Sequence, residues 1–136
     1  LEAAAGTFEP VFCHGDIQMS NLMVDASSEY AALLDWGACG WGDPAHDFAG
    51  VPLGMVPAML EGYRTLTEPE KGLEARILYR HLHLALFLLS RPPQPGRSWA
   101  ERPLGMMLEL LRFLLEGPDA AWRDLAALFK PPAGPA

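Results

Sequence analysis

The stretch HGDIQMSN, residues 14–21, places one imidazole, one carboxylate and one carboxamide within eight positions. A second polar stretch, LLDWGACGWGDPAHDFA at residues 33–49, follows it and holds three more aspartates. Apolar runs typical of short strands lie beside both stretches. Such a density of polar acceptors between strands is compatible with a solvated loop, and also with an active site built around a metal-bound phosphate.

The first third of the chain predicts short strands, and the remainder predicts helices. A strand is expected at 11–13, and apolar runs at 21–25 and 31–35, joined by 26–30, predict a hairpin. The hairpin strands lack clean alternation, which indicates that they are short or covered on both faces. Three glycines between positions 35 and 43 indicate tight turns.

Helix signals begin at Asp43-Pro44, an N-cap followed by proline at the first helical position. Further helices are expected from Pro57, from a capping box at 67–70 to about Ser90, from Pro103 to Gly117, and from Pro118 to about Phe129. The Met and Leu pattern at 104–116 predicts a core-facing helix. The sequence therefore predicts one domain over residues 1–136, with an α+β, mostly helical fold: a β-hairpin followed by a helical bundle.

Composition excludes some classes of partner. Half of the 136 residues are apolar, enough for a core, and the net charge of −7 disfavours nucleic acid, which usually requires clustered Lys and Arg. The longest apolar run, 84–89, is too short to cross a bilayer, so no membrane partner is expected. Cys13 and Cys39 form no disulfide framework and predict two thiols in a reducing cytoplasm.

The spacing of Asp16, Asn21 and Asp35 fits phosphoryl transfer. That reaction needs a carboxylate to orient and deprotonate the attacking hydroxyl, and oxygen ligands for Mg²⁺. Asp16 can supply the carboxylate. Asn21 is the first residue and Asp35 the last residue of the predicted hairpin, so the hairpin can bring them together over one metal ion.

These two segments resemble the catalytic and metal loops of the aminoglycoside phosphotransferase family, a branch of the protein-kinase-like fold. The matching residues are HGD at 14–16, Asn21, LDWG at 34–37 and GDPAHDFA at 42–49. The resemblance implies that Asp16 is the catalytic base and that Asn21 and Asp35 bind Mg²⁺. It also implies that His14 and Asp47 are structural supports of the catalytic loop.

The same resemblance implies a phosphotransferase that uses ATP and a small-molecule alcohol or amino sugar as acceptor. The chain would be its carboxy-terminal lobe, without the amino-terminal nucleotide lobe and its phosphate-binding lysine, and would be inactive alone. A protein kinase is disfavoured, because Gln18 stands where those enzymes usually have lysine and no activation segment separates Asp35 from the next helix. Leucine and methionine side chains near the loop, Leu22, Met23 and Leu34, would be partly uncovered, which predicts self-association or a longer protein.

Several interpretations remain open. Asp43 and Trp41 are candidates for substrate contact, although the sequence favours an N-cap role for Asp43, and packing explains Trp41 at least as well. His14, Asp16, His46 and Asp47 could instead build the metal centre of a phosphohydrolase. A non-catalytic kinase-like interaction module is the third alternative. His81 and His83, two apart on a helix, are not expected to share a ligand.

Overall fold

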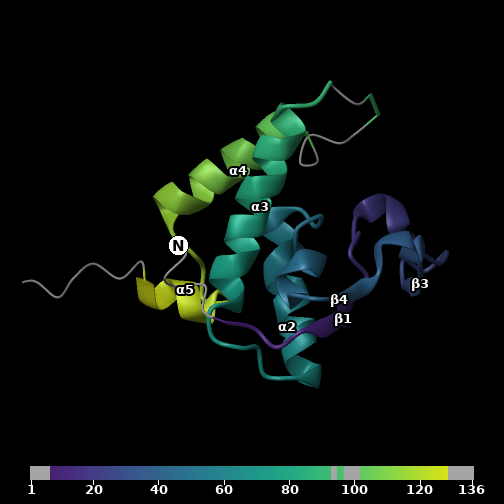
Figure 1. The fold of residues 1–136 in the computed structure, drawn as a ribbon, viewed down its shortest axis with the longest axis horizontal. Helices are drawn as coiled ribbons and strands as arrows, with labels where there is room; N and C mark the ends of the chain where they lie inside the picture. The colour runs from purple at the N-terminus through teal and green to yellow at the C-terminus, as the bar shows by residue number, and fades with distance from the viewer. Residues whose placement is uncertain (1–6, 93–94, 97–101, 129–136) are drawn as a thin grey trace, which may run out of the picture.

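The computed structural model describes residues 7–92, 95–96 and 102–128 (Figure 1). The strands are β1 Val11–Cys13, β2 Leu22–Val24, β3 Tyr30–Leu33 and β4 Gly40–Gly42, and the α-helices are α2 Val56–Leu66, α3 Leu73–Leu89, α4 Pro103–Glu116 and α5 Arg123–Leu128. Short 3₁₀ helices lie at Met19–Asn21, Trp36–Ala38, Pro44–Phe48 and Leu53–Met55. The prediction of a mixed α+β chain, with strands first and helices after, is confirmed.

The strands form two small antiparallel sheets. β2 pairs with β3 as the predicted hairpin, with Leu22 opposite Leu33. β1 pairs with β4, with Cys13 opposite Gly40, and this pairing was not predicted. The glycines of β4 suggested turns, but neither Gly40 nor Gly42 has a positive φ, and both lie in extended backbone.

The hairpin strands lack alternation because they are short, with three and four residues, and not because they are covered. In Figure 1 the hairpin end of the chain projects away from the helices, with β3 at its outer edge. Leu22, Met23 and Leu34 are 37%, 47% and 44% exposed, as expected. The hairpin therefore gains little from burial.

The predicted cap at Asp43 is confirmed, but the helix that it begins is a short 3₁₀ helix. The Asp43 side chain accepts a hydrogen bond from the backbone N–H of Ala45, and Pro44 follows at the first helical position. Phe48 closes this helix and is fully buried. The burial of Phe48 fixes the end of the second polar stretch onto the helical core.

Helix α3 begins later than its predicted capping box. Gly72, with φ of 87°, precedes the first helical residue, Leu73. Glu70 does not cap the helix: its carboxylate accepts a hydrogen bond from Glu9 N at 2.7 Å and pairs with Arg76. The box was therefore wrong, because its acid is used by a tertiary contact.

The core lies where α2, α3, α4 and α5 meet the segment around Phe48. Its largest fully buried members are Phe48, Val56, Leu60, Leu73, Ile77, His81, Trp122 and Leu125. Leu73, Ile77 and His81, which lie on one face of α3, are buried. In Figure 1, α3 and α4 run side by side and α5 lies near one end of the pair.

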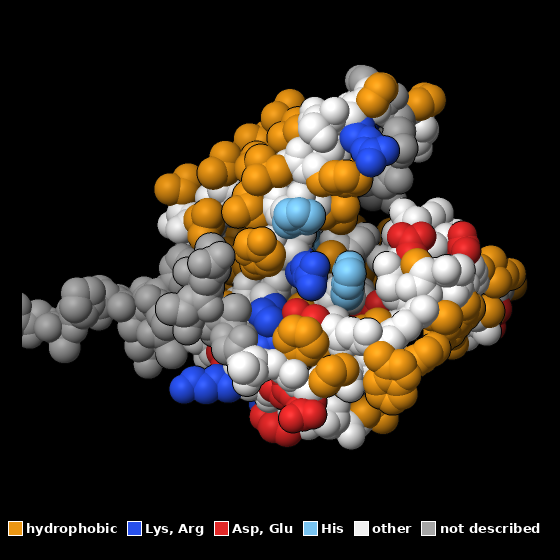
Figure 2. Space-filling view, viewed as in Figure 1, with side chains coloured by type: hydrophobic (Ala, Val, Ile, Leu, Met, Phe, Trp, Pro, Cys, Tyr) orange, Lys and Arg blue, Asp and Glu red, His pale blue; other side chains and the backbone are white. Residues whose placement is uncertain are grey.

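The prediction that α4 is a core-facing helix is confirmed for one face, where Leu110 is buried in the core and Met106, Met107 and Phe113 pack against it. The bounds of α4 are as expected, but Leu104, Leu108, Leu111 and Leu115 are all exposed. Apolar side chains cover much of its outer face in Figure 2. The helix packs against α3 through a narrow stripe, so its apolar pattern is wider than the surface available to it.

None of the described helices is both long and apolar enough to cross a membrane. The expected end of the last helix at Phe129 lies outside the described residues. Within them, α5 begins at Arg123 and not at Pro118. The reason is a distant acid, Glu74, which binds the start of this helix.

The carboxylate of Glu74 is buried in α3 and accepts hydrogen bonds from the N–H groups of Arg123, Asp124 and Leu125, at 2.8–3.0 Å. It also pairs with Arg64 at 2.6 Å. A carboxylate at a helix N-terminus satisfies donors that have no partner within the helix and interacts favourably with the helix dipole. Glu74 therefore holds three helices, α2, α3 and α5, together.

We predict that Glu74→Gln lowers the free energy of unfolding by about 3–5 kcal/mol, because it leaves the buried Arg64 charge without its partner. Urea denaturation measures the loss. Glu61→Gln, an exposed position on α2, is the control and should change stability little. Equal stability of the Glu74→Gln variant and the wild type would contradict the assigned role.

His81 is a neutral, buried imidazole. Its Nε2 lies 3.0 Å from the Phe48 carbonyl, to which the ring donates, and burial lowers the pKa of His81 from 6.5 to about 4. His83, two positions on, is exposed. The two histidines lie on different faces of α3, as expected.

We predict that His81 makes folding depend on pH between about 6.5 and 4. The unfolded chain binds a proton near pH 6.5 and the native ring does not, so stability is full above 6.5 and falls as pH drops toward 4, by about 3 kcal/mol in all. His81→Gln should flatten this part of the profile, whereas His83→Gln should keep it. A profile unchanged by His81→Gln would refute the assignment.

Candidate active site

The loop at residues 14–16 is held by the carboxylate of Asp47, which lies in the 3₁₀ helix at the end of the second motif. Asp47 Oδ2 accepts a hydrogen bond from His14 N at 2.8 Å, and Oδ1 accepts one from Gly15 N at 2.7 Å. Both oxygens are used, and both partners are backbone. We call this arrangement the Asp47 clamp; it ties the two sequence motifs together across more than thirty residues.

His14 is buried and uses both ring nitrogens within the loop. Its Nε2 lies 2.9 Å from the Leu34 carbonyl, and its Nδ1 accepts the Asp16 N–H at 3.2 Å. A carbonyl only accepts and an N–H only donates, so the ring is neutral with its proton on Nε2. The Trp36 ring packs edge-on against it, with centroids 4.6 Å apart. His14 therefore joins the loop to the end of the hairpin.

Two glycines allow backbone to approach this loop from either side. Gly15 has φ of +84°, and a Cβ there would overlap the Ala38 carbonyl. A Cβ at Gly50 would overlap the Ile17 carbonyl. At each of these two positions the backbone segments approach so closely that only glycine fits.

The two oxygens of Asp16 have different surroundings. Oδ2 accepts hydrogen bonds from Gln18 Nε2 at 2.9 Å and from Asn21 Nδ2 at 3.0 Å. Among the described residues no hydrogen bond reaches Oδ1. One oxygen is thus fixed in orientation, and the other remains able to accept a proton or a hydrogen bond.

Asn21 and Asp35 lie at the same end of the hairpin. The Leu34 N–H donates to the Asn21 carbonyl at 2.8 Å, which places Asp35 directly beyond this pairing. Asp35 is exposed, with φ of 59°, a left-handed conformation that a non-glycine residue adopts at a cost of roughly 1–2 kcal/mol. Within the described part of the chain, its only hydrogen bond is a long one, 3.4 Å, from Gly37 N.

These two side chains suit Mg²⁺ chemically. The Asn21 amide donates through nitrogen to Asp16, so its oxygen faces away from that contact, and the Asp35 carboxylate is accessible. Mg²⁺ prefers oxygen ligands and commonly takes one or two from protein, with water and phosphate completing the octahedron. The donor set fits the ion expected from the sequence.

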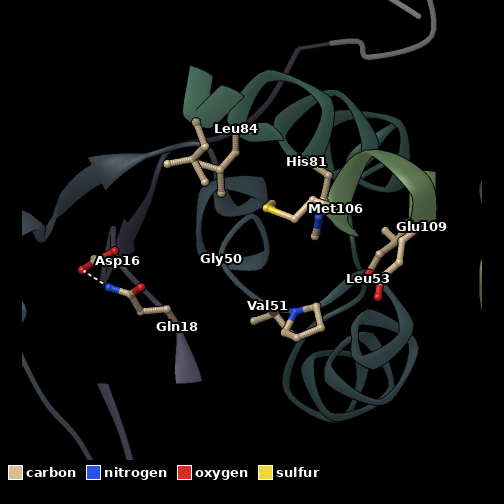
Figure 3. A pocket seen from close by; sticks show the side chains of 11 residues that line it. Asp16, Gln18, Gly50, Val51, Leu53, His81, Leu84, Met106 and Glu109 are labelled. Atoms are coloured by element: carbon tan, nitrogen blue, oxygen red, sulfur yellow. Dashed lines mark hydrogen bonds between the residues drawn. The ribbon is translucent and has the colours of Figure 1, made fainter. Parts of the chain in front are cut away.

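A cavity of about 220 Å³ opens beside Asp16 (Figure 3). Gln18 lines the same wall, and the other walls come from the 50–53 segment, α3 and α4. In Figure 3, Asp16 and its hydrogen bond to Gln18 lie on one side of this pocket, and Glu109 of α4 lies on the other. Asp16 is therefore placed to meet a bound small molecule.

Asp43 and Trp41, the candidates for substrate contact, do not line this pocket. The Asp43 carboxylate is buried, caps Ala45 and pairs with Arg76 at 3.0 Å, so the geometry accounts for it as a structural residue. Trp41 is 76% exposed and meets Phe12 edge-on, with ring centroids 6.0 Å apart. The expected contact with substrate has no support in this arrangement.

The alternative phosphohydrolase centre is not assembled. Both carboxylate oxygens of Asp47 accept hydrogen bonds from backbone N–H groups. Both ring nitrogens of His14 are hydrogen-bonded to backbone atoms, and His46 is exposed. Across the described part of the chain, no group of three or more His, Cys, Asp or Glu side chains is placed to hold a metal ion.

Two residues of the site were not recognised from the sequence. In the sequence, Gln18 differs from the lysine that protein kinases usually have at this position. In the structure, its amide orients Asp16. Glu109 was hidden within an apolar helical pattern. The only available signal was an acid flanked by leucines within an apolar helix. Such a position does not indicate which pocket wall the side chain reaches.

We predict that Asp47→Asn loosens the loop at residues 14–16. An amide offers one oxygen and one NH₂, so one of the two loop N–H groups loses its acceptor, at a cost of about 1–3 kcal/mol. Urea denaturation gives the cost, and amide hydrogen exchange at His14 and Gly15 locates it. His46→Gln, on the same 3₁₀ helix, is the control; equal exchange in both variants would refute the clamp.

Comparison with known proteins agrees with this geometry. No curated protein and no solved structure matches the chain. Residues 1–64 match the sequence model of the phosphotransferase enzyme family. That segment contains both motifs, the hairpin, and every residue of the Asp47 clamp. Residues 1–64 are thus similar to the phosphotransferase enzyme family, as the resemblance of the motifs predicted.

Proposed function

We propose that this chain is the catalytic lobe of an ATP-dependent phosphotransferase whose acceptor is the hydroxyl group of a small molecule. The observation that carries the proposal is the asymmetry of Asp16: one oxygen is pinned, and the other is unengaged in a residue that lines a pocket. The family match to residues 1–64 supports the reaction class.

Asp16 acts as the base in this proposal. Gln18 and Asn21 hold Oδ2, so Oδ1 is the oxygen that accepts the proton of the substrate hydroxyl as phosphoryl transfer proceeds. Neither donor is a cation, so no ion pair competes for the carboxylate. Fixing the carboxylate beforehand lowers the entropic cost of reaching the reactive geometry.

Asn21 and Asp35 would hold Mg²⁺, which offsets the charge that develops on the phosphoryl oxygens. The chain's own contribution is to position these ligands. Asn21 links them directly to the base, because its amide nitrogen donates to both the backbone oxygen and the carboxylate of Asp16, at 2.9 and 3.0 Å. Asn21 is therefore both a proposed metal ligand and the side chain that orients the base.

We further propose that residues outside this chain cover the nucleotide. The only lysines are Lys71 and Lys130, and neither belongs to the motif segment. The exposed apolar side chains of the hairpin, Leu22, Met23 and Val24, support a covering segment or a second copy at this face.

The test separates base from metal ligand. In the complete natural polypeptide, Asp16→Asn should lower the rate of phosphoryl transfer by about 10²–10⁴-fold while leaving the affinity for ATP·Mg²⁺ nearly unchanged. Asp35→Asn should weaken ATP·Mg²⁺ binding itself. Turnover of ATP against a panel of alcohols and amino sugars, with calorimetric titration of ATP·Mg²⁺, measures both.

His46→Gln is the matched control, because this exposed residue lies beside the clamp but outside the proposed machinery. It should retain activity. A folded but inactive His46→Gln protein that has lost a tightly bound transition metal would favour the phosphohydrolase. Full activity in Asp16→Asn would reject the assignment of the base.

A further inference from the structure

The pocket beside Asp16 has a second carboxylate, Glu109, on its opposite side (Figure 3). Glu109 lies on α4 and is partly exposed. No hydrogen bond or ion pair with any described residue engages its carboxylate, although other acids of the helical half, Glu70, Glu74 and Glu116, are all paired. A carboxylate without a partner in a pocket wall is available to a ligand.

The other polar groups of the pocket are mainly acceptors. His81 is neutral and donates through Nε2 to Phe48, which leaves Nδ1 as an acceptor. The Gln18 amide already donates to Asp16. Among the described residues that line the pocket, none is Lys or Arg. The site therefore suits ligands that donate hydrogen bonds or carry positive charge, and it disfavours anions.

The rest of the lining is apolar and limits the size of the ligand. Its members are Val51, Pro52, Leu53, Leu84, Leu88 and Met106. A volume of about 220 Å³ exceeds the roughly 150 Å³ of an apolar cavity that binds benzene. A single ring or a short chain fits these walls, whereas an acceptor with several polar rings would leave them poorly matched.

We propose that Glu109 is a specificity-determining residue that binds the protonated amine of the acceptor, while the hydroxyl of the same molecule meets Asp16. The acceptor class is then a compact amino alcohol with an apolar body between its two polar ends. This inference rests on the proposed function for the fate of the hydroxyl, but the binding of the amine requires no phosphoryl transfer.

The electrostatics favour this pairing over a neutral ligand. Two carboxylates face one pocket with no cation in its described lining, so a single ammonium group gains attraction from both. The apolar walls exclude part of the solvent, which strengthens the attraction relative to a fully exposed pair. The pocket distinguishes an ammonium from a hydroxyl at the Glu109 end by charge, and selects the length of the molecule by the separation of the two acids.

The experiment measures binding to this chain without nucleotide. Linear amino alcohols with three to eight carbons are titrated against the α,ω-diols of the same length, by calorimetry or by NMR shifts of Met106 and Leu84. We expect one chain length to bind best and its ammonium form to bind about three- to tenfold tighter than the matched diol. Glu109→Gln keeps the shape of the wall and should reduce that preference to less than twofold.

Glu116→Gln is the matched control, because it removes the same charge from the same helix outside this pocket. It should keep the preference. Equal binding of ammonium and diol by the wild type, no binding of any probe, or a preference that survives Glu109→Gln would each overturn the proposal. A preference lost in Glu109→Gln, together with no turnover of ATP by the complete natural polypeptide, would instead leave the proposal intact and reject the proposed phosphotransfer.

Discussion

The two hydrogen bonds that Asp47 accepts from the backbone of His14 and Gly15 are the constraint on which the site depends. They fix the start of the loop to a short 3₁₀ helix, and the last residue of this helix, Phe48, is buried in the core. The loop thereby acquires the rigidity of the helical half without being covered by it. Carboxylate acceptors for backbone N–H groups are stronger than neutral ones, so one side chain is sufficient.

From this fixed point the site is built by neighbours that each serve two purposes. His14 joins the loop to the Leu34 carbonyl at the end of the hairpin and also accepts the Asp16 N–H. Asn21 begins the hairpin and orients the Asp16 carboxylate. The strands themselves are short and exposed, so their position comes from these polar contacts and not from burial of apolar surface.

The sequence was sufficient where function depends on local order. The hairpin with Asn21 and Asp35 at one end and the cap at Asp43 follow from spacing, turn residues and capping chemistry. Prediction failed where distant contacts decide. Glu74 sets the start of α5 from about fifty residues away, Glu70 is diverted from its capping box, and β4 is a strand only because β1 lies beside it. Local preference is a weak guide when tertiary contacts override it.

The family match covers one part of the site, the motif segment, and does not cover the other part, the pocket residues on α3 and α4. The proposed base, the metal ligands and the clamp all lie within residues 1–64, which match the phosphotransferase family. Five of the pocket-lining residues lie on α3 and α4 beyond that segment: His81, Leu84, Leu88, Met106 and Glu109. In the proposed function, the matched segment carries out the reaction, and these helices help to form the pocket for the acceptor. Met106 and Glu109 of α4 take no part in the Asp47 clamp, so a substitution at either position leaves the hydrogen bonds that hold the loop in place, and one chemistry can serve different acceptors.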